Sequence, residues 1–292
     1  MSPITVALPA IKLKKQKNIP VIMNVQDLWP ENIIAITGIN NSFINFFINK
    51  LVNYIYINID LILVASPAFI DKITFRIKDK NKVIYWPQYS IVSKNGEQDI
   101  KIFNNKNFNI VFTGNIGDAQ GLEILIDAAK RLKETNIVFH LIGDGRNRQK
   151  LEEEVNINNL NDKIIFYGQI PENEIPKYLS NSNVALLILK PNPIFDMTIP
   201  AKFQTYLACG CPILGCVHGI SKQIIDDNQL GITTEVVNAQ ALVTTCEMLL
   251  KNKEKIELYS QNALLFSKTN FDKEILIEKL IYYMEEIKNE SI

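Results

Sequence analysis

Short apolar runs alternate with amphipathic stretches along most of the chain. From Asn107 onward each apolar run is followed by a segment with apolar residues at helical spacing, which predicts alternating strands and helices. The predicted strands are 109–114, 137–143, 163–168, 183–189 and 212–215, and the predicted helices are 121–134, 148–155, 172–180 and 200–208. Strands that are apolar throughout and alternate with helices indicate a parallel sheet covered on both faces.

The first part of the chain repeats this pattern. Strands are predicted at 19–25, 60–66 and 83–86, with helices at 42–58 and 67–78 between them. The polar run 93–107 has the composition of a linker. Apolar residues at helical spacing in Phe271–Asn289 predict one amphipathic C-terminal helix. We therefore expect an α/β fold with two parallel-sheet units.

Composition supports two folded cores and excludes one class of partner. The chain has 292 residues, a length that favours two domains, and 47% of them are hydrophobic while only 21% are charged. The 31 Lys and Arg residues balance 31 Asp and Glu residues. A neutral chain lacks the basic footprint of a nucleic-acid-binding protein, so we expect no nucleic-acid partner.

The cysteines and the N-terminus indicate a reducing compartment. The cysteines have neither the even spread of a disulfide scaffold nor a paired zinc pattern, and each lies in or beside an apolar stretch: Cys209, Cys211, Cys216 and Cys246. We interpret them as small hydrophobic residues. At the N-terminus the lysines follow the apolar run, which is the reverse of a secretory signal.

The most apolar region, Phe43–Ile70, is interrupted by polar residues and is too broken for a membrane-spanning helix. It predicts a buried helix followed by a strand. Its aromatic residues, together with nearby lysines, could also rest on a membrane surface: Phe43, Phe46, Phe47, Tyr54 and Tyr56 with Lys12, Lys14, Lys15 and Lys17. Packing in the core is the favoured interpretation, because the following strand must be covered.

Three loops at the carboxyl ends of predicted strands are candidate ligand sites: 114–117, 143–145 and 196–202. In the third loop Pro200 suits the first position of a helix and Thr198 could cap that helix. Free N–H groups at a helix N-terminus bind anions, and Lys202 would add a positive charge beside a phosphate. The alternative is an ordinary capped helix with a solvated lysine.

Other familiar sites fit poorly. The Gly143-Asp144-Gly145 segment lacks the third glycine of a dinucleotide fingerprint and follows the second strand of its unit, so a dehydrogenase is disfavoured. We interpret His140, within a strand, as a hydrogen-bonded core residue. His218 lies in a more open loop, but no serine or cysteine stands at a recognisable nucleophile elbow, so no catalytic triad is predicted.

The motifs taken together resemble a known family. Phe112-Thr113-Gly114, then Gly121-Leu122, LIGDG, FYG, Pro200-Ala201-Lys202 and Ala208-Cys209-Gly210-Cys211-Pro212 follow the order found in family 4 glycosyltransferases of the GT-B fold. The segment Asp27-Leu28-Trp29-Pro30-Glu31 resembles a bacterial, WbuB-like subgroup that builds surface polysaccharides on lipid carriers.

The resemblance implies a domain organisation. Residues 1–103 would form a Rossmann-like N-terminal domain on the acceptor side, incomplete because the family's first strands and glycine loop have no counterpart after Met1. Residues 104–270 would form the Rossmann-like domain that binds the nucleotide sugar. Residues 271–292 would be the helix that crosses back to the first domain. The expected fold class is thus GT-B type, with two parallel-sheet domains.

The resemblance also implies site residues. The donor would contact residues in three loops: Gly114, Asn115, Gln120, Gly168, Gln169, Asp196, Thr198, Ile199, Pro200, Lys202 and Thr205. Asn115 and Gln120 stand where many members have Arg and Lys, and the family's two glutamates map onto Met197 and Thr205. Gln26 replaces a histidine of the cleft. Asp27 is the catalytic candidate, to orient the acceptor or accept its proton; alternatively it caps a helix.

The implied function is transfer of a sugar, N-acetylated and UDP-linked, to a lipid-linked acceptor in surface polysaccharide synthesis. No Asp-x-Asp motif is present, so we expect no metal and no other cofactor. The expected location is the cytoplasm, including the inner face of the membrane. Two alternatives stay open: an inactive or split fragment that binds nucleotide sugar and needs a complementing chain, or a sugar-nucleotide epimerase.

Overall fold

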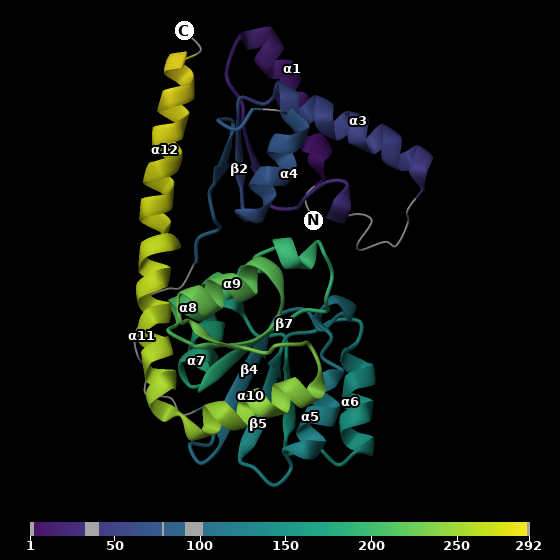
Figure 1. Cartoon of the computed structure of the whole chain (residues 1–292), viewed down its shortest axis with the longest axis vertical. Coiled ribbons are helices and arrows are strands. Elements are labelled where there is room, and N and C mark those ends of the chain that lie inside the picture. The colour runs from purple at the N-terminus through teal and green to yellow at the C-terminus, as the bar shows by residue number, and fades with distance from the viewer. Residues whose placement is uncertain (1–2, 33–40, 78, 91–101, 291–292) are drawn as a thin grey trace. The chain divides into compact units, whose positions relative to one another are not determined.

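Every β-strand pairing among the residues that the structure describes is parallel. The structure is a computed structural model, and it describes residues 3–32, 41–77, 79–90 and 102–290 (Figure 1). The chain forms two compact units: unit 1 comprises residues 1–89, 192–199 and 271–292, and unit 2 comprises residues 90–191 and 200–270. The predicted second domain, 104–270, includes 192–199, which the structure assigns to unit 1.

Unit 2 contains a six-stranded sheet in the order β6-β5-β4-β7-β8-β9. The strands are β4 (Phe108–Thr113), β5 (Ile137–Ile142), β6 (Ile164–Gly168), β7 (Val184–Ile188), β8 (Ile213–Cys216) and β9 (Gly231–Thr233). The first strand of the unit, β4, lies at the centre, and the chain progresses outward in both directions from it. This is the strand order of a Rossmann fold, with its topological switch point between β4 and β7.

Unit 2 has the four predicted helical segments up to residue 208 and further helices after them. The helices are η2 (Asp118–Gln120), α5 (Ile124–Arg131), α6 (Arg148–Ile157), η3 (Glu172–Glu174), α7 (Ile175–Ser180), α8 (Ala201–Ala208), α9 (Gly219–Asp227), α10 (Ala239–Lys251) and α11 (Lys253–Asn270). One core cluster joins Leu125 of α5 and Leu242 of α10 to Phe112 and Phe139 of the central strands. Burial of these strands on both faces explains why they are apolar throughout.

Unit 1 contains the three-stranded sheet β1-β2-β3. Its elements are η1 (Ile4–Val6), α1 (Ala7–Lys17), β1 (Ile22–Val25), α3 (Ser42–Asn58), β2 (Leu61–Val64), α4 (Ala68–Ile77), β3 (Val83–Tyr85), η4 (Phe195–Met197) and α12 (Lys273–Glu290). Ile62 packs with α3 and α4, while Leu63 packs with Leu276 of α12. Successive residues of β2 therefore face opposite layers.

Helix α3 has the predicted bounds but not the favoured packing. Tyr56 is fully buried, as expected for a core residue. Phe43, Phe46, Phe47 and Tyr54 are exposed, so the expectation that they pack in the core is wrong.

The end of the predicted linker is part of unit 2. Residues 91–101 lie outside the described part of the chain, but Phe103 is buried and stacks on His140, with 4.0 Å between ring centroids. The two ring nitrogens of His140 lie 3.0 Å from Tyr167 Oη and from Asn109 Oδ1. Burial lowers the pKa of His140 to about 4. The interpretation of His140 as a satisfied core residue is confirmed.

The four cysteines are free thiols. Cys211, Cys216 and Cys246 are buried, and burial raises the pKa of Cys211 and Cys216 to about 12. These three thiols serve as small hydrophobic residues, as predicted. Among the described residues, no cluster of three or more His, Cys, Asp or Glu side chains is placed to hold a metal ion. The described helices include none with the length and apolarity needed to cross a bilayer.

Candidate functional site

A cavity of about 550 Å³ opens at the carboxyl edge of the unit 2 sheet. Its walls come from the loops after β4, β5 and β6, from α7, and from the first turns of α8. The lining residues are Thr113, Gly114, Asn115, Ile142, Gly143, Asp144, Gln169, Ile170, Glu172, Ile175, Pro176, Ala201, Lys202 and Thr205. This is the position beside the switch point where doubly wound sheets bind ligands.

The loops after β4 and β5 approach each other so closely that glycine is required between them. Gly143 has φ +134°, and a Cβ atom there would lie 2.0 Å from the carbonyl oxygen of Gly114. The Gly114 N–H donates to Ile142 O at 2.9 Å, and the Gly143 N–H donates to Gly168 O at 2.7 Å. These contacts fix the backbone along one wall of the cavity, so its shape does not depend on side-chain rotamers.

Helix α8 points its N-terminus at the cavity, although it begins one residue later than predicted. Pro200 is the N-cap with φ −65° and ψ 140°, not the first helical residue. The hydroxyl of Thr198, predicted to cap this helix, donates instead to Ile194 O at 2.9 Å. The first N–H groups of a helix have no carbonyl partner within it, so the amides of Ala201 and Lys202 are suited to an anion.

The amino group of Lys202 is buried. Its Nζ atom is buried, has no hydrogen-bond partner among the described residues, and lies 3.8 Å from the centre of the Phe112 ring. A Cβ atom on Gly114 would lie 3.2 Å from that Nζ, so the absence of a side chain there leaves room for it. Burial lowers the pKa of Lys202 to about 7. The alternative of a solvated lysine is therefore wrong, and an anion beside Nζ would supply the missing partner.

Tyr206, one turn after Lys202, fastens α8 to the sheet. Its buried hydroxyl accepts a hydrogen bond from the Thr113 N–H at 3.0 Å and lies 3.4 Å from Leu186 O. These two strand residues belong to β4 and β7, so one side chain joins both strands at the switch point to the helix. Tyr206 was not among the predicted site residues; its signal was the position four residues after Lys202, on the same face of α8.

Comparison with known proteins identifies this unit. The family model described as "Glycosyl transferases group 1" matches residues 93–265, which is more than half of the chain. The chain belongs to this family. The cavity and α8 both lie within the matched span, so they are features of a group 1 glycosyl transferase domain.

Individual relatives agree with that assignment. The chain is 24% identical over 223 residues to the probable glycosyltransferase WbjE of Pseudomonas aeruginosa, a match that covers 72% of this chain and 54% of WbjE. It is 26% identical over 162 residues to the putative colanic acid biosynthesis glycosyl transferase WcaI of Escherichia coli, covering 52% of this chain and 39% of WcaI. The group 1 glycosyl transferase chain thus matches about half or less of each relative.

The fold also matches solved GT-B structures. Anabaena HepE, crystallised in complex with UDP, superimposes with a TM-score of 0.79 at 14% identity, covering 97% of this chain and 77% of HepE. The prediction of an α/β, GT-B type fold with two parallel-sheet domains is confirmed. At this level of identity the likeness shows the fold alone.

The structure brings together some of the predicted donor-binding residues of the group 1 glycosyl transferase domain. Gly114, Asn115, Gln169, Lys202 and Thr205 all line the cavity. They come from two loops and one helix that are far apart in the sequence, and the parallel sheet places them at one edge.

The other predicted donor-binding residues lie elsewhere. Gln120 Oε1 accepts a hydrogen bond from the Gly117 N–H at 3.3 Å and closes the 3₁₀ turn η2. Gly168 O accepts from the Gly143 N–H, and Pro200 is the N-cap of α8; neither lines the cavity. Asp196, Thr198 and Ile199 belong to unit 1.

The cavity is also lined by two acidic residues that were not among the predicted donor-binding residues, Asp144 and Glu172. An Asp144 oxygen accepts from the Gly145 N–H at 2.7 Å, and the second lies 3.7 Å from an Arg148 nitrogen. The position of Asp144 after the glycine that ends β5 was the available signal. An anion in this cavity of the group 1 glycosyl transferase would therefore meet Lys202 on one side and carboxylates on another.

Asp27, the predicted catalytic residue, lies in unit 1 shortly after β1. Its carboxylate accepts a hydrogen bond from Asn32 Nδ2 at 2.7 Å, and it lines a cavity of about 200 Å³ with Trp29 and Gln26. Asp27 therefore accepts from a side chain, whereas a residue that caps a helix would accept from backbone N–H groups.

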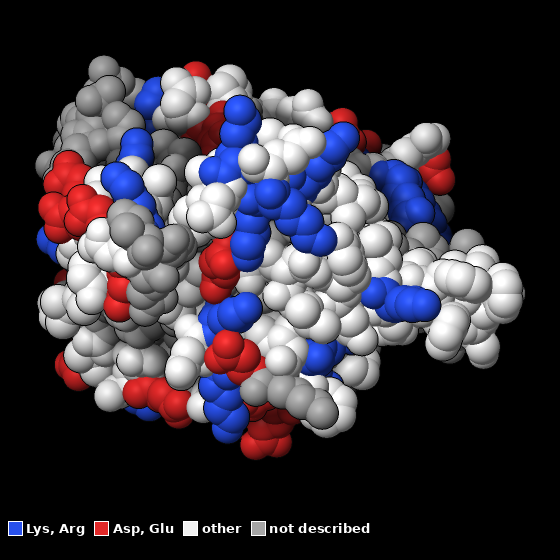
Figure 2. All heavy atoms as spheres, turned by 90° about the horizontal axis from the view of Figure 1, so that it is seen from above, with Lys and Arg blue, Asp and Glu red and all other residues white. Residues whose placement is uncertain are grey.

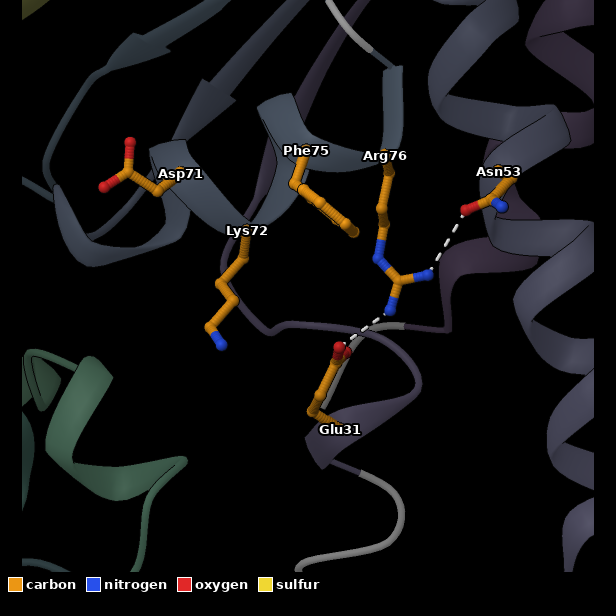
Figure 3. Close-up of a pocket in the computed structure, with 6 residues that line it drawn as sticks. All are labelled: Glu31, Asn53, Asp71, Lys72, Phe75 and Arg76. Atoms are coloured by element: carbon orange, nitrogen blue, oxygen red, sulfur yellow. Dashed lines mark hydrogen bonds and ion pairs between the residues drawn. The ribbon is translucent and has the colours of Figure 1, made fainter.

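A second cavity of unit 1, of about 700 Å³, borders the segment that follows Asp27. Figure 3 shows Arg76 reaching from α4 toward Glu31 and Asn53. An Arg76 nitrogen lies 2.7 Å from Glu31 Oε1, and the other donates to Asn53 Oδ1 at 3.2 Å. This ion pair anchors the DLWPE segment of the group 1 glycosyl transferase to α4.

Proposed function

We propose that this chain binds the diphosphate of a UDP-linked sugar in the unit 2 cavity and transfers that sugar to an acceptor. Membership of the glycosyl transferase family supports sugar transfer. HepE, which shares the fold, was crystallised with UDP and with UDP-glucose. The donor sugar we propose is an N-acetylated amino sugar, on the resemblance of Asp27-Leu28-Trp29-Pro30-Glu31 to the WbuB-like subgroup.

One observation carries the proposal: the buried, unpartnered Nζ of Lys202 beside the N-terminus of α8. An uncompensated cation is costly to bury, and a phosphate oxygen removes that cost by accepting its hydrogen bonds. The amides of Ala201 and Lys202, at the start of α8 and beside the same cavity, favour the same ligand. The glycine backbone at Gly114 permits a large anion to approach closely.

The reaction follows from these contacts. The acceptor hydroxyl attacks the anomeric carbon, the bond from that carbon to the diphosphate oxygen breaks, and the electron pair leaves with UDP. We propose that Lys202 and the α8 amides stabilise the charge that develops on the leaving diphosphate, without a metal ion. Asp27 is the proposed acceptor of the proton released by the attacking hydroxyl.

We propose a lipid-linked acceptor and a place of action in the cytoplasm, at the inner face of the membrane. WcaI, named for colanic acid biosynthesis, and AmsK of Erwinia amylovora, named for amylovoran biosynthesis, support a role in surface polysaccharide synthesis. The alternative hypothesis is a split fragment that needs a complementing chain. Sugar transfer by this chain alone would contradict that alternative.

The first test is titration calorimetry of the purified chain with UDP, UMP and uridine. If the diphosphate provides the main contact, UDP binds at least about tenfold more tightly than UMP, because one charge-assisted contact is lost with the β-phosphate. Folded protein that binds no UDP would overturn the proposal. Product analysis with UDP-N-acetylhexosamines and a lipid-linked acceptor then separates transfer from epimerisation, since an epimerase changes the donor without consuming the acceptor.

A further inference from the structure

Helix α3 presents large apolar side chains to the side that faces away from its core. Its buried residues are Val52, Ile55 and Tyr56. Its exposed apolar residues are Ile44 and five others, Phe43, Phe46, Phe47, Tyr54 and Ile57, and these five are called here the α3 stripe. At 100° per residue the members of the stripe fall within one third of the helix circumference, opposite the buried side.

The exposure of the stripe is large for side chains of this type. Phe43 is 72% exposed, Phe46 62% and Phe47 55%. The rings pack on one another edge to face, with centroids of Phe43 and Phe47 4.9 Å apart and those of Phe46 and Phe47 5.5 Å apart. They form a continuous apolar surface, which is unfavourable in water and typical of a surface that contacts another phase or molecule.

The charged residues of α1 and α3 are all basic. Helices α1 and α3 contain no acidic residue, while they hold Lys12, Lys14, Lys15, Lys17 and Lys50. The chain as a whole is neutral, so this is a local concentration of positive charge. Figure 2 shows one face of the molecule on which basic side chains gather beside a broad uncharged surface.

A direct contact joins the lysines to the stripe. Lys15 Nζ lies 3.3 Å from Tyr54 Oη and 5.5 Å from the centre of the Tyr54 ring. This contact places Lys15 of α1 directly beside Tyr54 of the α3 stripe. Lys14 pairs with Asp60 at 2.5 Å, while Lys12, Lys15 and Lys17 of α1 are exposed.

We propose that the α3 stripe and the lysines of α1 dock this chain on an anionic phospholipid bilayer. Aromatic rings enter the boundary between headgroups and acyl chains, and lysines beside them pair with lipid phosphates. A second copy of the chain fits less well, because its own lysines would meet lysines of like charge. The inference deepens the proposed function, on which it rests, since a lipid-linked acceptor is confined to the bilayer.

Vesicle co-sedimentation of the full chain tests the docking surface. The wild type is expected to bind vesicles that contain phosphatidylglycerol at least about tenfold more tightly than vesicles of phosphatidylcholine alone, and added salt should weaken this binding. The double variant Phe46→Gln/Phe47→Gln is expected to lose at least about tenfold in affinity. The matched control is Phe75→Gln, because Phe75 lies on α4 of the same unit, is 86% exposed and lies outside the stripe.

A second set of variants tests the charge. Lys12→Gln/Lys15→Gln/Lys17→Gln should lose the preference for anionic lipid, while Lys251→Gln/Lys253→Gln/Lys255→Gln, on exposed positions of unit 2, should keep it. All substituted side chains are exposed, so the variants should melt with the wild type. Equal binding to both vesicles, or unchanged binding of the Phe46/Phe47 variant, would overturn the inference. A concentration-dependent dimer that this variant abolishes in sedimentation velocity would assign the stripe to self-association instead.

Vesicle binding and UDP binding can be measured independently of each other. Vesicle binding is measured without nucleotide, and UDP affinity is measured by calorimetry on the same variants, which should retain it. Loss of vesicle binding with UDP affinity intact supports the docking surface. A wild type that binds vesicles but not UDP would contradict the proposed function and leave the docking surface in place.

Discussion

The Nζ atom of Lys202 lies 3.8 Å from the centre of the Phe112 ring and has no hydrogen-bond partner among the described residues. The face of an aromatic ring offsets only part of the cost of burying a charge. Within the described part of the chain, the Lys202 ammonium group therefore lacks a counter-charge, which an anionic ligand can supply. We therefore expect Lys202 to contribute to ligand binding and not to the stability of the fold. Both expectations can be tested.

Replacing Lys202 by Met should affect binding and stability in opposite directions. Loss of a charge-assisted hydrogen bond should weaken UDP binding about 10- to 100-fold. Removal of an unpaired buried charge should raise the free energy of unfolding by about 1 to 2 kcal/mol, since Met fills a similar volume. Calorimetry and urea unfolding measure the two effects. Lys177→Met, at an exposed lysine of α7, is the control and should change neither. Lower stability of Lys202→Met would indicate a structural lysine.

The titration of Lys202 should contribute to the pH dependence of the free energy of unfolding. Its pKa is lowered from 10.5 to about 7 by burial, so between these values the unfolded chain holds a proton that the folded chain has released. The contribution of Lys202 to stability therefore rises with pH across this window. The advantage of Lys202→Met over the wild type should shrink between pH 7 and pH 10. Unfolding curves of both proteins at matched pH values measure that difference, and a constant difference would contradict the assignment.

Binding of a phosphate should be linked to proton uptake by the same group. A bound anion favours the charged amine and raises its pKa, so the affinity for UDP should fall as pH rises from 7.5 to 9.5, where a terminal phosphate is already fully ionised. Calorimetry in buffers of different ionisation enthalpy reports the protons taken up. Lys202→Met should show a flatter profile, and an equally steep one would assign the protons to another group.

The sequence was sufficient for the sheet of unit 2 and insufficient for details that depend on tertiary packing. Motif spacing placed Gly114 and Lys202 at one edge because parallel strands leave no other choice. Tyr206 was missed because an apolar-looking helix position does not reveal that its hydroxyl reaches Thr113. Helix α3 is apolar on both sides, so periodicity could not decide that Tyr56 faces the core and Phe47 faces outward.

Gly143 should be intolerant of a side chain. Gly143→Ala would put a Cβ atom 2.0 Å from Gly114 O at a φ of +134°, so separation of the two loops is unavoidable. We expect a loss of at least about 2 kcal/mol in the free energy of unfolding, together with weaker UDP binding. Gly117→Ala is the control: its nearest neighbour would be the flexible Asn115 side chain, and its φ is −123°. Similar losses in both variants would mean that backbone contact at Gly143 is not the cause.

The two tryptophans of unit 1 provide a matched pair for the packing of α12. Trp86 Nε1 donates to Leu276 O at 2.9 Å, whereas Trp29 Nε1 is buried with no partner among the described residues. Replacing either by Phe removes the same ring atoms, but only Trp86→Phe breaks a hydrogen bond, whereas Trp29→Phe removes a buried donor that has no partner among the described residues. Trp86→Phe should therefore cost about 1 kcal/mol more than Trp29→Phe. Urea unfolding followed by circular dichroism measures both variants. Equal costs would show that the bond to Leu276 contributes nothing to holding α12 against the sheet.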